Sequence, residues 1–278
     1  MYKFAIDKNE FGETYHVGAA MVFCTDVEAY LVGDGMEDRK EFLSSLGGEN
    51  RVHCITRNEY DCERDKFNYV GCTTNIIKQH FQNKRLDLEK FFLGRLSNEE
   101  LKEIKGFLSQ RIKDKTKKYV LVWIRNGGYK VERNITSLAL KQLEKAVKEL
   151  GYDPIYIGEK IENIDAHQNL IEYYKDSIFT INRIRRQLWM FKLLQENCVI
   201  CATGMMSGGI DGPAFLGMPT IYFAKEDATG RMKQLDGVIP RYHHIPIEYK
   251  KEFEKFSEEE IGAFKNILKE MELNHFEK

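Results

Sequence analysis

Residues 198–223, CVICATGMMSGGIDGPAFLGMPTIYF, contain the pattern that decides the fold of this chain. The run 198–202 is apolar, as in a strand covered on both faces, and a glycine-rich turn follows it. We expect a short helix near 211–217 and a second buried strand over Thr220–Phe223. A strand, a helix and a strand in this order predict a right-handed crossover within a parallel sheet.

The same alternation occurs before this stretch. Tyr119–Ile124 is a continuous apolar run that predicts another buried parallel strand. A helix is predicted over 137–150, with its cap within Asn134–Thr136, and a strand over Pro154–Ile157. An amphipathic helix over 183–196 then leads into the strand at 198–202. These segments predict a Rossmann-like α/β lobe.

The first part of the chain has a weaker pattern. Tyr2–Ile6 predicts an opening strand, and a polar loop is expected from there to His16. From Val17 the residues are compatible with a helix to Leu31 or with a strand over Val17–Cys24. Further short strands are predicted at 52–56 and 68–70.

Two capping boxes mark the starts of helices. Ser97 with Glu100 predicts a helix to about Ile112, and Ser257 with Glu260 predicts a C-terminal helix to about 272. The lysine-rich stretch 113–118 lies between the two parts of the chain. We therefore expect two α/β lobes, residues 1–115 and 116–278, around a cleft.

The composition narrows the function classes. The 278 residues contain 42 Lys and Arg against 43 Asp and Glu, so no global field attracts nucleic acid or an anionic membrane. The N-terminus lacks the pattern of a signal peptide, and no apolar stretch is long enough to span a bilayer, so a cytoplasmic protein is expected. Cys198 and Cys201 lie in an apolar strand, where residues three apart face opposite sides, and are predicted to be core thiols.

The turn at Thr203–Gly209 is the strongest candidate for a ligand site. Glycines at 204, 208 and 209 let the backbone approach a ligand closely, and the following helix directs free N–H groups to the same place. Ser207 adds a hydroxyl donor. Because ligands bind beyond the carboxyl ends of parallel strands, this turn predicts an anion site, although a tight connection without a ligand has the same pattern.

The run from Leu188 to Phe223 resembles the donor-binding segment of GT-B glycosyltransferases, including the heptosyltransferase and fucosyltransferase branches. The resemblance implies a donor diphosphate on Ser207, Gly208 and Gly209, with Thr203 and Gly204 in the same turn, and sugar or ribose hydroxyls near Asp211. Heptosyltransferases carry a histidine shortly after this turn. Here Ala214 and Phe215 occupy that region.

Arg125 and Asn126 follow the strand at 119–124 and predict a second phosphate contact. A guanidinium group binds phosphate oxygens with two donors and stays charged, so Arg125 is expected to neutralise the diphosphate as a metal would. This resembles the His-x-Arg motif of the fucosyltransferase-like branch, with Trp123 in place of the histidine. Lys130 and Arg133 follow closely and can assist as cations, and solvated side chains are the alternative.

Two further positions complete the expected donor site. Gly158 and Glu159, at the end of the next strand, fall where related transferases bind the nucleobase or ribose. Within the helix start at 183–187 one polar side chain can face the cleft, although charge at a helix start is usually solvated.

The candidate base for the acceptor hydroxyl comes from the opening loop of the first part. Glu13 and His16 are the candidates, because GT-B enzymes commonly supply this group from the first lobe. His243 and His244 are adjacent and point in opposite directions in an extended chain, so they are poorly arranged as joint ligands. The sequence contains no H-E-x-x-H or D-x-D signature, which predicts a mechanism without a metal.

The sequence therefore predicts a metal-independent glycosyltransferase that moves a sugar from a nucleotide-diphosphate-sugar to an acceptor hydroxyl, in glycan or glycoconjugate synthesis of the bacterial type. The nucleotide-sugar is the substrate, and no other cofactor is expected. A nucleotide-sugar epimerase of the same two-lobed form is one alternative. A non-catalytic protein that binds a sugar or nucleotide is the other.

Overall fold

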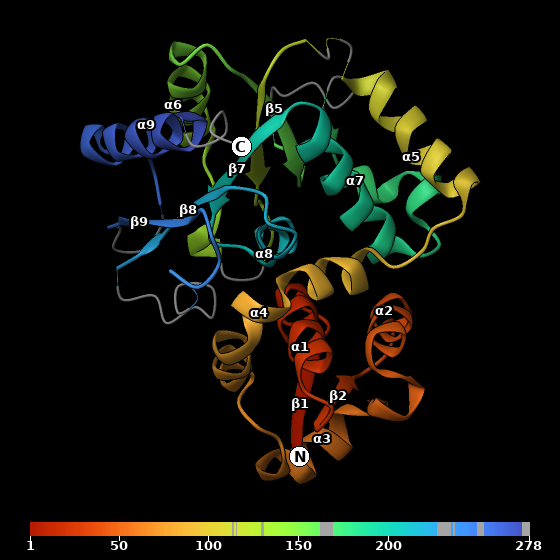
Figure 1. The fold of residues 1–278 in the computed structure, drawn as a ribbon. Coiled ribbons are helices and arrows are strands. Elements are labelled where there is room, and N and C mark those ends of the chain that lie inside the picture. The colour runs from red at the N-terminus through yellow and green to blue at the C-terminus, as the bar shows by residue number, and fades with distance from the viewer. Residues whose placement is uncertain are drawn as a thin grey trace.

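The computed structural model describes residues 1–112, 114, 116–128, 131–161, 169–226, 235, 237–248 and 253–273. Within these ranges the chain forms two parallel β-sheets, one of three strands and one of six, with helices packed against both (Figure 1). The predicted α/β class with parallel sheets is confirmed. Lys113 and Lys115 of the predicted linker, and Lys130, lie outside the described residues.

The three-stranded sheet contains β1 (Tyr2–Asp7), β2 (Val27–Val32) and β3 (Val52–Ile55), paired in that order. The strands predicted at 2–6 and 52–56 are confirmed. The strand predicted at 68–70 is wrong, because Asn68 forms only an isolated bridge with Phe4. Within the described ranges, short 3-10 turns lie at Glu49–Arg51, Arg64–Lys66, Val70–Cys72, Val131–Arg133, Tyr173–Lys175 and Ser177–Phe179.

Helix α1 (Phe11–Phe23) replaces the loop that we expected up to His16. It packs against α2, α4 and α8, so its residues from Gly12 to Met21 are buried on every side. A helix covered all round shows no polar face in the sequence, which explains the wrong prediction. The helix expected from Val17 is confirmed as far as Phe23 and is wrong beyond it, because β2 begins at Val27, and the strand alternative over Val17–Cys24 is wrong.

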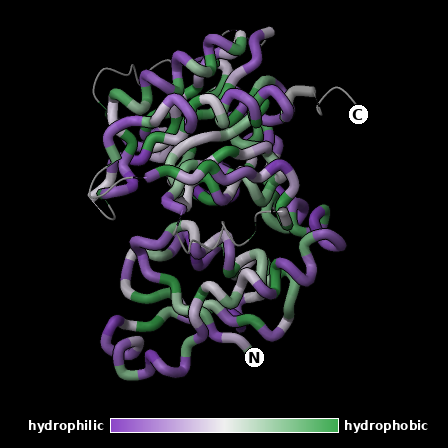
Figure 2. The backbone as a smooth tube through the Cα atoms, turned by 90° about the vertical axis from the view of Figure 1, so that its left-hand side faces the viewer, coloured by the Kyte–Doolittle hydropathy of each residue, from purple (hydrophilic) through white to green (hydrophobic). Residues whose placement is uncertain are grey.

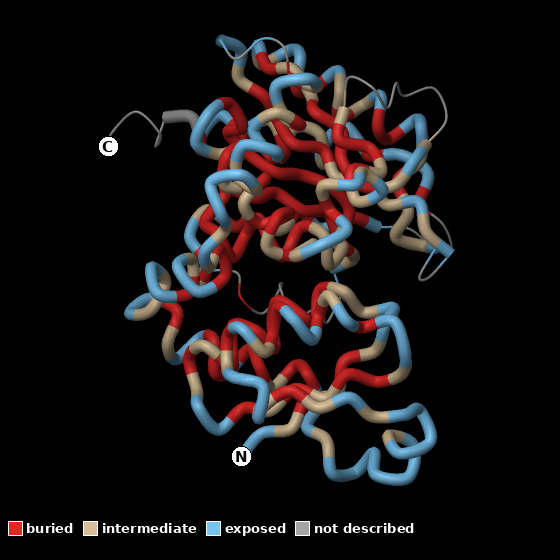
Figure 3. Tube along the Cα trace, turned by 90° about the vertical axis from the view of Figure 1, so that its right-hand side faces the viewer, coloured by how far each residue is buried: buried red, intermediate tan, exposed pale blue. Residues whose placement is uncertain are grey.

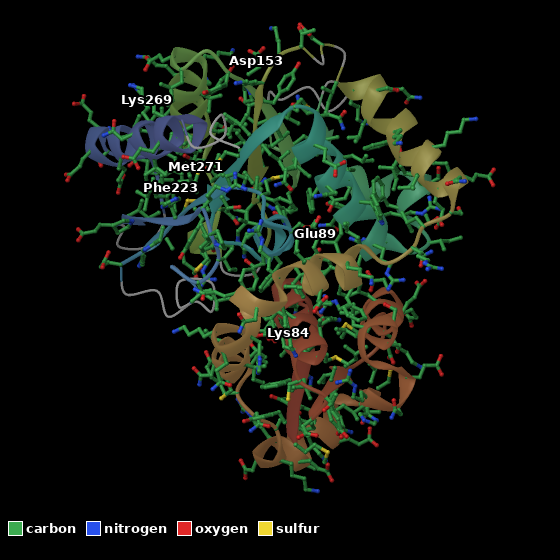
Figure 4. All side chains as sticks on the ribbon, in the orientation of Figure 1. Lys84, Glu89, Asp153, Phe223, Lys269 and Met271 are labelled. Carbon is green, nitrogen blue, oxygen red and sulfur yellow. The ribbon has the colours of Figure 1, made fainter. Side chains whose placement is uncertain are left out.

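Three further helices, α2 (Glu37–Gly47), α3 (Arg57–Glu63) and α4 (Thr73–Leu93), follow the first strands. Helix α4 bends at Lys84, which has non-helical backbone angles and is labelled in Figure 4. Beyond the bend, Glu89 forms a 2.6 Å ion pair with Lys192 of helix α7 (Arg183–Asn197). Helix α4 therefore contacts helices that pack on both sheets.

Helix α5 (Asn98–Arg111) begins at the predicted capping box. The Ser97 hydroxyl accepts from the Glu100 amide at 3.1 Å, and the Glu100 carboxylate accepts from the Ser97 amide at 2.8 Å. The helix packs against α7, and Arg186 of α7 is 3.2 Å from Glu100. Helix α5 therefore precedes the predicted boundary at residue 115 but contacts helices of the larger sheet.

The six-stranded sheet is parallel throughout and has the strand order β6-β5-β4-β7-β8-β9. Its strands are β4 (Tyr119–Ile124), β5 (Asp153–Gly158), β6 (Leu170–Ile171), β7 (Val199–Met205), β8 (Thr220–Lys225) and β9 (Tyr242–Ile247). The chain first runs outward from β4 to β6 and then returns to the other side of β4. This is the order of a Rossmann-type sheet, with its topological switch point between β4 and β7.

Helices cover both faces of this sheet. Helices α6 (Ser137–Glu149) and α9 (Glu258–Leu273) lie on one face, and α7 and α8 (Gly208–Phe215) on the other (Figure 1). The first pair encloses an apolar cluster that includes Phe223 of β8 and Met271 of α9, both labelled in Figure 4. The helices predicted from 137 and 183, and the capping box at Ser257, are confirmed.

The second apolar cluster joins the two sheets. Phe215 of α8 lies 6.0 Å from Phe92 of α4 and 6.5 Å from Phe81, measured between ring centroids. Figure 2 shows apolar segments inside both parts of the molecule, and Figure 3 shows the buried residues following the strands and α1. The small sheet and one face of the large sheet therefore share one core.

The glycine turn is shorter than predicted. Strand β7 continues to Met205, and α8 begins at Gly208, earlier than the predicted start at 211. Gly208 and Gly209 therefore belong to the first turn of the helix. Within the described ranges, no helix has the length and apolar character needed to cross a membrane.

Candidate functional site

A cavity of about 670 Å³ is lined by residues from the surroundings of both sheets. On one side it meets the loop after β1, and on the other it meets the loops after β4, β5 and β7. Its volume is typical of small-molecule sites, which span about 300–1,000 Å³. The cavity lies at the switch point of the six-stranded sheet, where open α/β sheets bind ligands.

The N-terminus of α8 forms one wall. Ser207 is the N-cap residue, and its hydroxyl accepts from the Gly209 amide at 3.2 Å. Ser207, Gly208 and Gly209 all line the cavity, as predicted phosphate ligands should. The Gly209 and Ile210 amides donate to Ser207 itself, so the positive end of the helix dipole is what favours an anion at this wall. Thr203 and Gly204 lie within β7 and do not line the cavity.

Trp123 explains why position 209 is glycine. Its side chain lines the cavity and packs against Phe191, with ring centroids 6.0 Å apart. A Cβ atom at Gly209 would overlap the indole ring of Trp123. The backbone of the first turn of α8 therefore lies directly against a rigid aromatic side chain.

The N-terminus of α1 meets the N-terminus of α8 at the same cavity. A Cβ atom at Gly12 would lie 2.6 Å from the Gly208 Cα atom and 2.7 Å from an Asp211 carboxylate oxygen. Two glycines thus allow two helix starts to touch. Because both helix starts carry partial positive charge, their approach is favourable only with negative charge nearby. Asp211, in the first turn of α8, supplies part of that charge.

The two predicted bases lie on α1 and not in a loop. Glu13 is 5% exposed and does not line the cavity. His16 lines the cavity, but its side chain is 0% exposed, and its Nε2 atom is 3.2 Å from Asp211 Oδ2. This contact joins α1 to α8, so Asp211 contacts a protein group where a ribose or sugar contact was predicted.

Arg125 follows β4 and lines the cavity as predicted. Its carbonyl oxygen accepts from the Ile135 amide at 3.0 Å, which fixes the backbone of this loop. Arg133 also lines the cavity. These two residues add positively charged side chains to the lining of the cavity.

Two further arginines of the cavity are engaged with the protein. Arg39 donates to the carbonyl oxygens of Asp7, at 2.8 Å, and of Lys8, and thereby braces the loop after β1. Burial lowers the pKa of Arg39, while Asp38 and Asp7 oppose that effect. Arg183 lies 3.8 Å from Asp38 and over the ring of Tyr174. We expected one side chain from the helix start at 183–187 to face the cleft. Two of these residues, Arg183 and Gln187, line the cavity.

Glu159 and Asn126 connect two loops. Glu159 lines the cavity, and its carboxylate accepts from the Asn126 amide, while the Asn126 side chain donates to the Lys160 carbonyl at 3.0 Å. Asn126 itself does not line the cavity. Gly158 lines it and has a φ of +105°, a conformation that favours glycine.

Several cavity residues were not found from the sequence. Lys8 and Glu10 line the cavity and lie just after β1. Because ligands bind beyond the carboxyl ends of parallel strands, the predicted strand at 2–6 already indicated this loop. Tyr173 is buried, which raises the pKa of its phenol, and Tyr69 is 71% exposed at the cavity. Neither tyrosine belongs to a motif that the sequence shows.

Comparison with known proteins gives no relatives. The chain matches no protein-family model, no curated protein and no solved structure. Among the described residues, no group of three or more His, Cys, Asp or Glu side chains could hold a metal ion. The cavity lining combines two helix N-termini with Arg39, Arg125, Arg133 and Arg183.

Proposed function

We propose that the protein is a metal-independent glycosyltransferase of the GT-B type, with one of the two sheets in each of its two lobes. Its donor would be a nucleotide-diphosphate-sugar bound in the 670 Å³ cavity. The observation that carries the proposal is that the touching N-termini of α1 and α8 line the same cavity as Arg125. This combination suits a diphosphate, because the positive ends of two helix dipoles and a guanidinium group can stabilise the charge that develops on the leaving group.

The cavity also offers contacts for the rest of the donor. Trp123, Tyr173 and Tyr174 are aromatic residues in its lining. Flat faces of this kind favour a nucleobase or a sugar ring. Glu159, held by the Asn126 amide, lies beside the same wall.

In the proposed reaction the acceptor hydroxyl loses its proton to a base, and its oxygen forms a bond to the anomeric carbon of the donor. The bond between that carbon and the diphosphate oxygen breaks, and the nucleoside diphosphate leaves with the electron pair. Helix N-termini and Arg125 stabilise the charge on the leaving group. No metal is needed for this step.

We assign the base to Glu10 in place of Glu13 and His16. Glu10 directly precedes α1, lines the cavity and is only half-buried, whereas Glu13 and His16 are buried within the helix. A base must reach the acceptor hydroxyl within a hydrogen bond, and Glu10 is the better placed of the three.

Product analysis with nucleotide-sugars tests the proposal. The full chain is incubated with UDP-, GDP-, ADP- and dTDP-sugars, and with a CMP-sugar as a donor that has a single phosphate. Release of a nucleoside diphosphate from one diphosphate donor is expected, with little reaction in Arg125→Ala and full reaction in Arg95→Ala. Arg95 is an exposed arginine outside the cavity. An isomerised donor would instead indicate an epimerase, and binding without turnover a sensor.

A further inference from the structure

A second cavity, of about 280 Å³, adjoins the first. It lies at the carboxyl ends of β1 and β2 and against α3, and Asp7 and Val32 at the strand ends line it. Asn9 and Glu10 line both cavities. The two spaces therefore share a wall, and that wall carries the carboxylate assigned above as the base.

The charged groups of the second cavity nearly balance. Arg57 and Arg64 provide two positive charges, and Asp7, Glu10 and Asp61 provide three negative charges. Arg57 is paired with Asp7. Burial acts to raise the pKa of Asp7, but the Asn9 amide, at 3.1 Å, and Arg57 lower it overall, so Asp7 is ionised at neutral pH. An anionic ligand would gain little from such a lining.

The second cavity also has one aromatic wall. Tyr60 lines it, with Arg57 over its ring at 5.5 Å from the centroid. The Tyr60 ring packs against Phe67 at 5.4 Å, which restrains its orientation. Guanidinium donors, carboxylate acceptors and an aromatic face together suit a ring with several hydroxyl groups. Hydroxyl groups both donate to carboxylates and accept from arginines.

We propose that the second cavity is the acceptor subsite and that it takes a neutral, polyhydroxylated sugar. This inference rests on the proposed transferase function, because Glu10 on the shared wall can act as a base only when a donor is bound in the first cavity. A sugar hydroxyl in the second cavity faces Glu10, and the anomeric carbon of the donor lies beyond it. The nearly neutral lining selects against phosphorylated and acidic acceptors.

Saturation-transfer NMR on the full chain tests this inference. The probes are the methyl glycosides of glucose, galactose, mannose and N-acetylglucosamine, measured with and without the nucleoside diphosphate that binds. Glucose 6-phosphate is the acidic comparison. Saturation transfer to at least one neutral glycoside is expected, at least fivefold weaker in Tyr60→Ala and in Arg64→Ala, and unchanged in Arg95→Ala.

The two proposals can fail separately. Absence of saturation transfer to every glycoside, with normal nucleotide binding, would overturn the acceptor subsite and leave the donor site standing. Equal signals in wild type and Tyr60→Ala, or a stronger signal from glucose 6-phosphate, would also overturn it. Loss of nucleotide binding would instead refute the donor site, and the measurement without nucleotide would still report on the second cavity.

Discussion

The two walls of the main cavity differ in the atoms that they present. On the side of the six-stranded sheet, the wall at α8 consists of backbone packed against Trp123 and against Gly12 of α1. On the side of the three-stranded sheet, the loop after β1 presents the side chains of Lys8, Asn9 and Glu10. One wall has close-packed backbone, and the other has side chains that reach into solvent.

The two walls are therefore suited to different functions, one to binding a phosphate group and the other to chemistry by side chains. A backbone wall binds a common group such as a phosphate and tolerates no added atoms, so its sequence requirement is glycine. A side-chain wall can change its chemistry without changing the fold. We therefore expect substitutions in the first wall to affect binding and stability together, and those in the second to affect turnover alone.

The largest effect is expected from Glu10→Gln. Loss of a general base typically costs about 10²–10⁴-fold in rate, while an amide of the same shape preserves packing. Turnover of the reactive nucleotide-sugar should fall by at least about 100-fold, with unchanged nucleotide affinity and melting temperature. Glu37→Gln, an exposed carboxylate outside both cavities, is the control. Full activity in Glu10→Gln, with loss in Glu13→Gln, would return the role to Glu13.

The next effect is expected from Gly209→Ala. The added Cβ overlaps the Trp123 ring, so the ring or the first turn of α8 must move, at a cost of about 1–3 kcal/mol. Both chemical-denaturation stability and nucleoside diphosphate affinity should decrease. Gly128→Ala also lies in the cavity lining, but a Cβ there has no atom within 4 Å, so it should leave both quantities nearly unchanged. Equal effects of the two alanines would contradict the packed-backbone wall.

Gly12→Ala tests the contact between the two helix starts. The new methyl group would press on Gly208 and on Asp211, so we expect a loss of about 1–3 kcal/mol in the free energy of unfolding. Gly106→Ala, inside α5 with open space around it, should instead stabilise by about 0.5–1 kcal/mol. Urea titrations of both variants measure the difference. A neutral Gly12→Ala would show that α1 and α8 do not need this close approach.

The smallest effect on stability is expected from Glu100→Gln in the capping box at the start of α5. Hydrogen bonding to the Ser97 amide, with help from Asn182, Ser97 and Arg186, lowers the pKa of Glu100 to about 2 despite the opposing effect of burial. The folded state thus favours the ionised carboxylate, and its stabilisation is present above about pH 4.5 and is lost as the pH falls towards 2. Glu100→Gln should flatten this acid dependence and cost about 1 kcal/mol at pH 7.

The box at Thr56 and Glu59 near the smaller sheet is the matched comparison. Glu59 is exposed, and its pKa is lowered by its bonds to the Thr56 amide and hydroxyl. Glu59→Gln should change the acid dependence less than Glu100→Gln, because only Glu100 also contacts α7. A larger effect at Glu59 would contradict this ranking.

The larger sheet was predictable because its central strands are continuous apolar runs between amphipathic helices. Tyr119–Ile124 and Thr220–Phe223 are recognisable in this way, and each leads to a loop at the correct edge of the sheet. The positions of Ser207–Gly209 and Arg125 at this edge could therefore be predicted from the order of the strands, while their phosphate-binding role was implied by the resemblance. Their meeting in one cavity follows from the switch point between β4 and β7.

The smaller sheet and the acceptor side were not predictable to the same degree. Helix α1 is buried on every side, so its sequence shows neither helical periodicity nor a polar face. Its contact partners, Phe92 of α4 and Phe215 of α8, lie more than 65 residues away in the chain. The burial of Glu13 and His16 depends on these distant contacts.

Calorimetric titration with UDP, GDP, ADP and dTDP tests the central claim most directly. The account predicts that one of these binds and that Arg125→Ala weakens it by about 2 kcal/mol, close to 30-fold, while Arg95→Ala does not. At 100 times its dissociation constant, the same ligand should stabilise the fold by about 2.7 kcal/mol. Failure of every nucleoside diphosphate to bind, or equal affinity in Arg125→Ala, would contradict a diphosphate site at the start of α8.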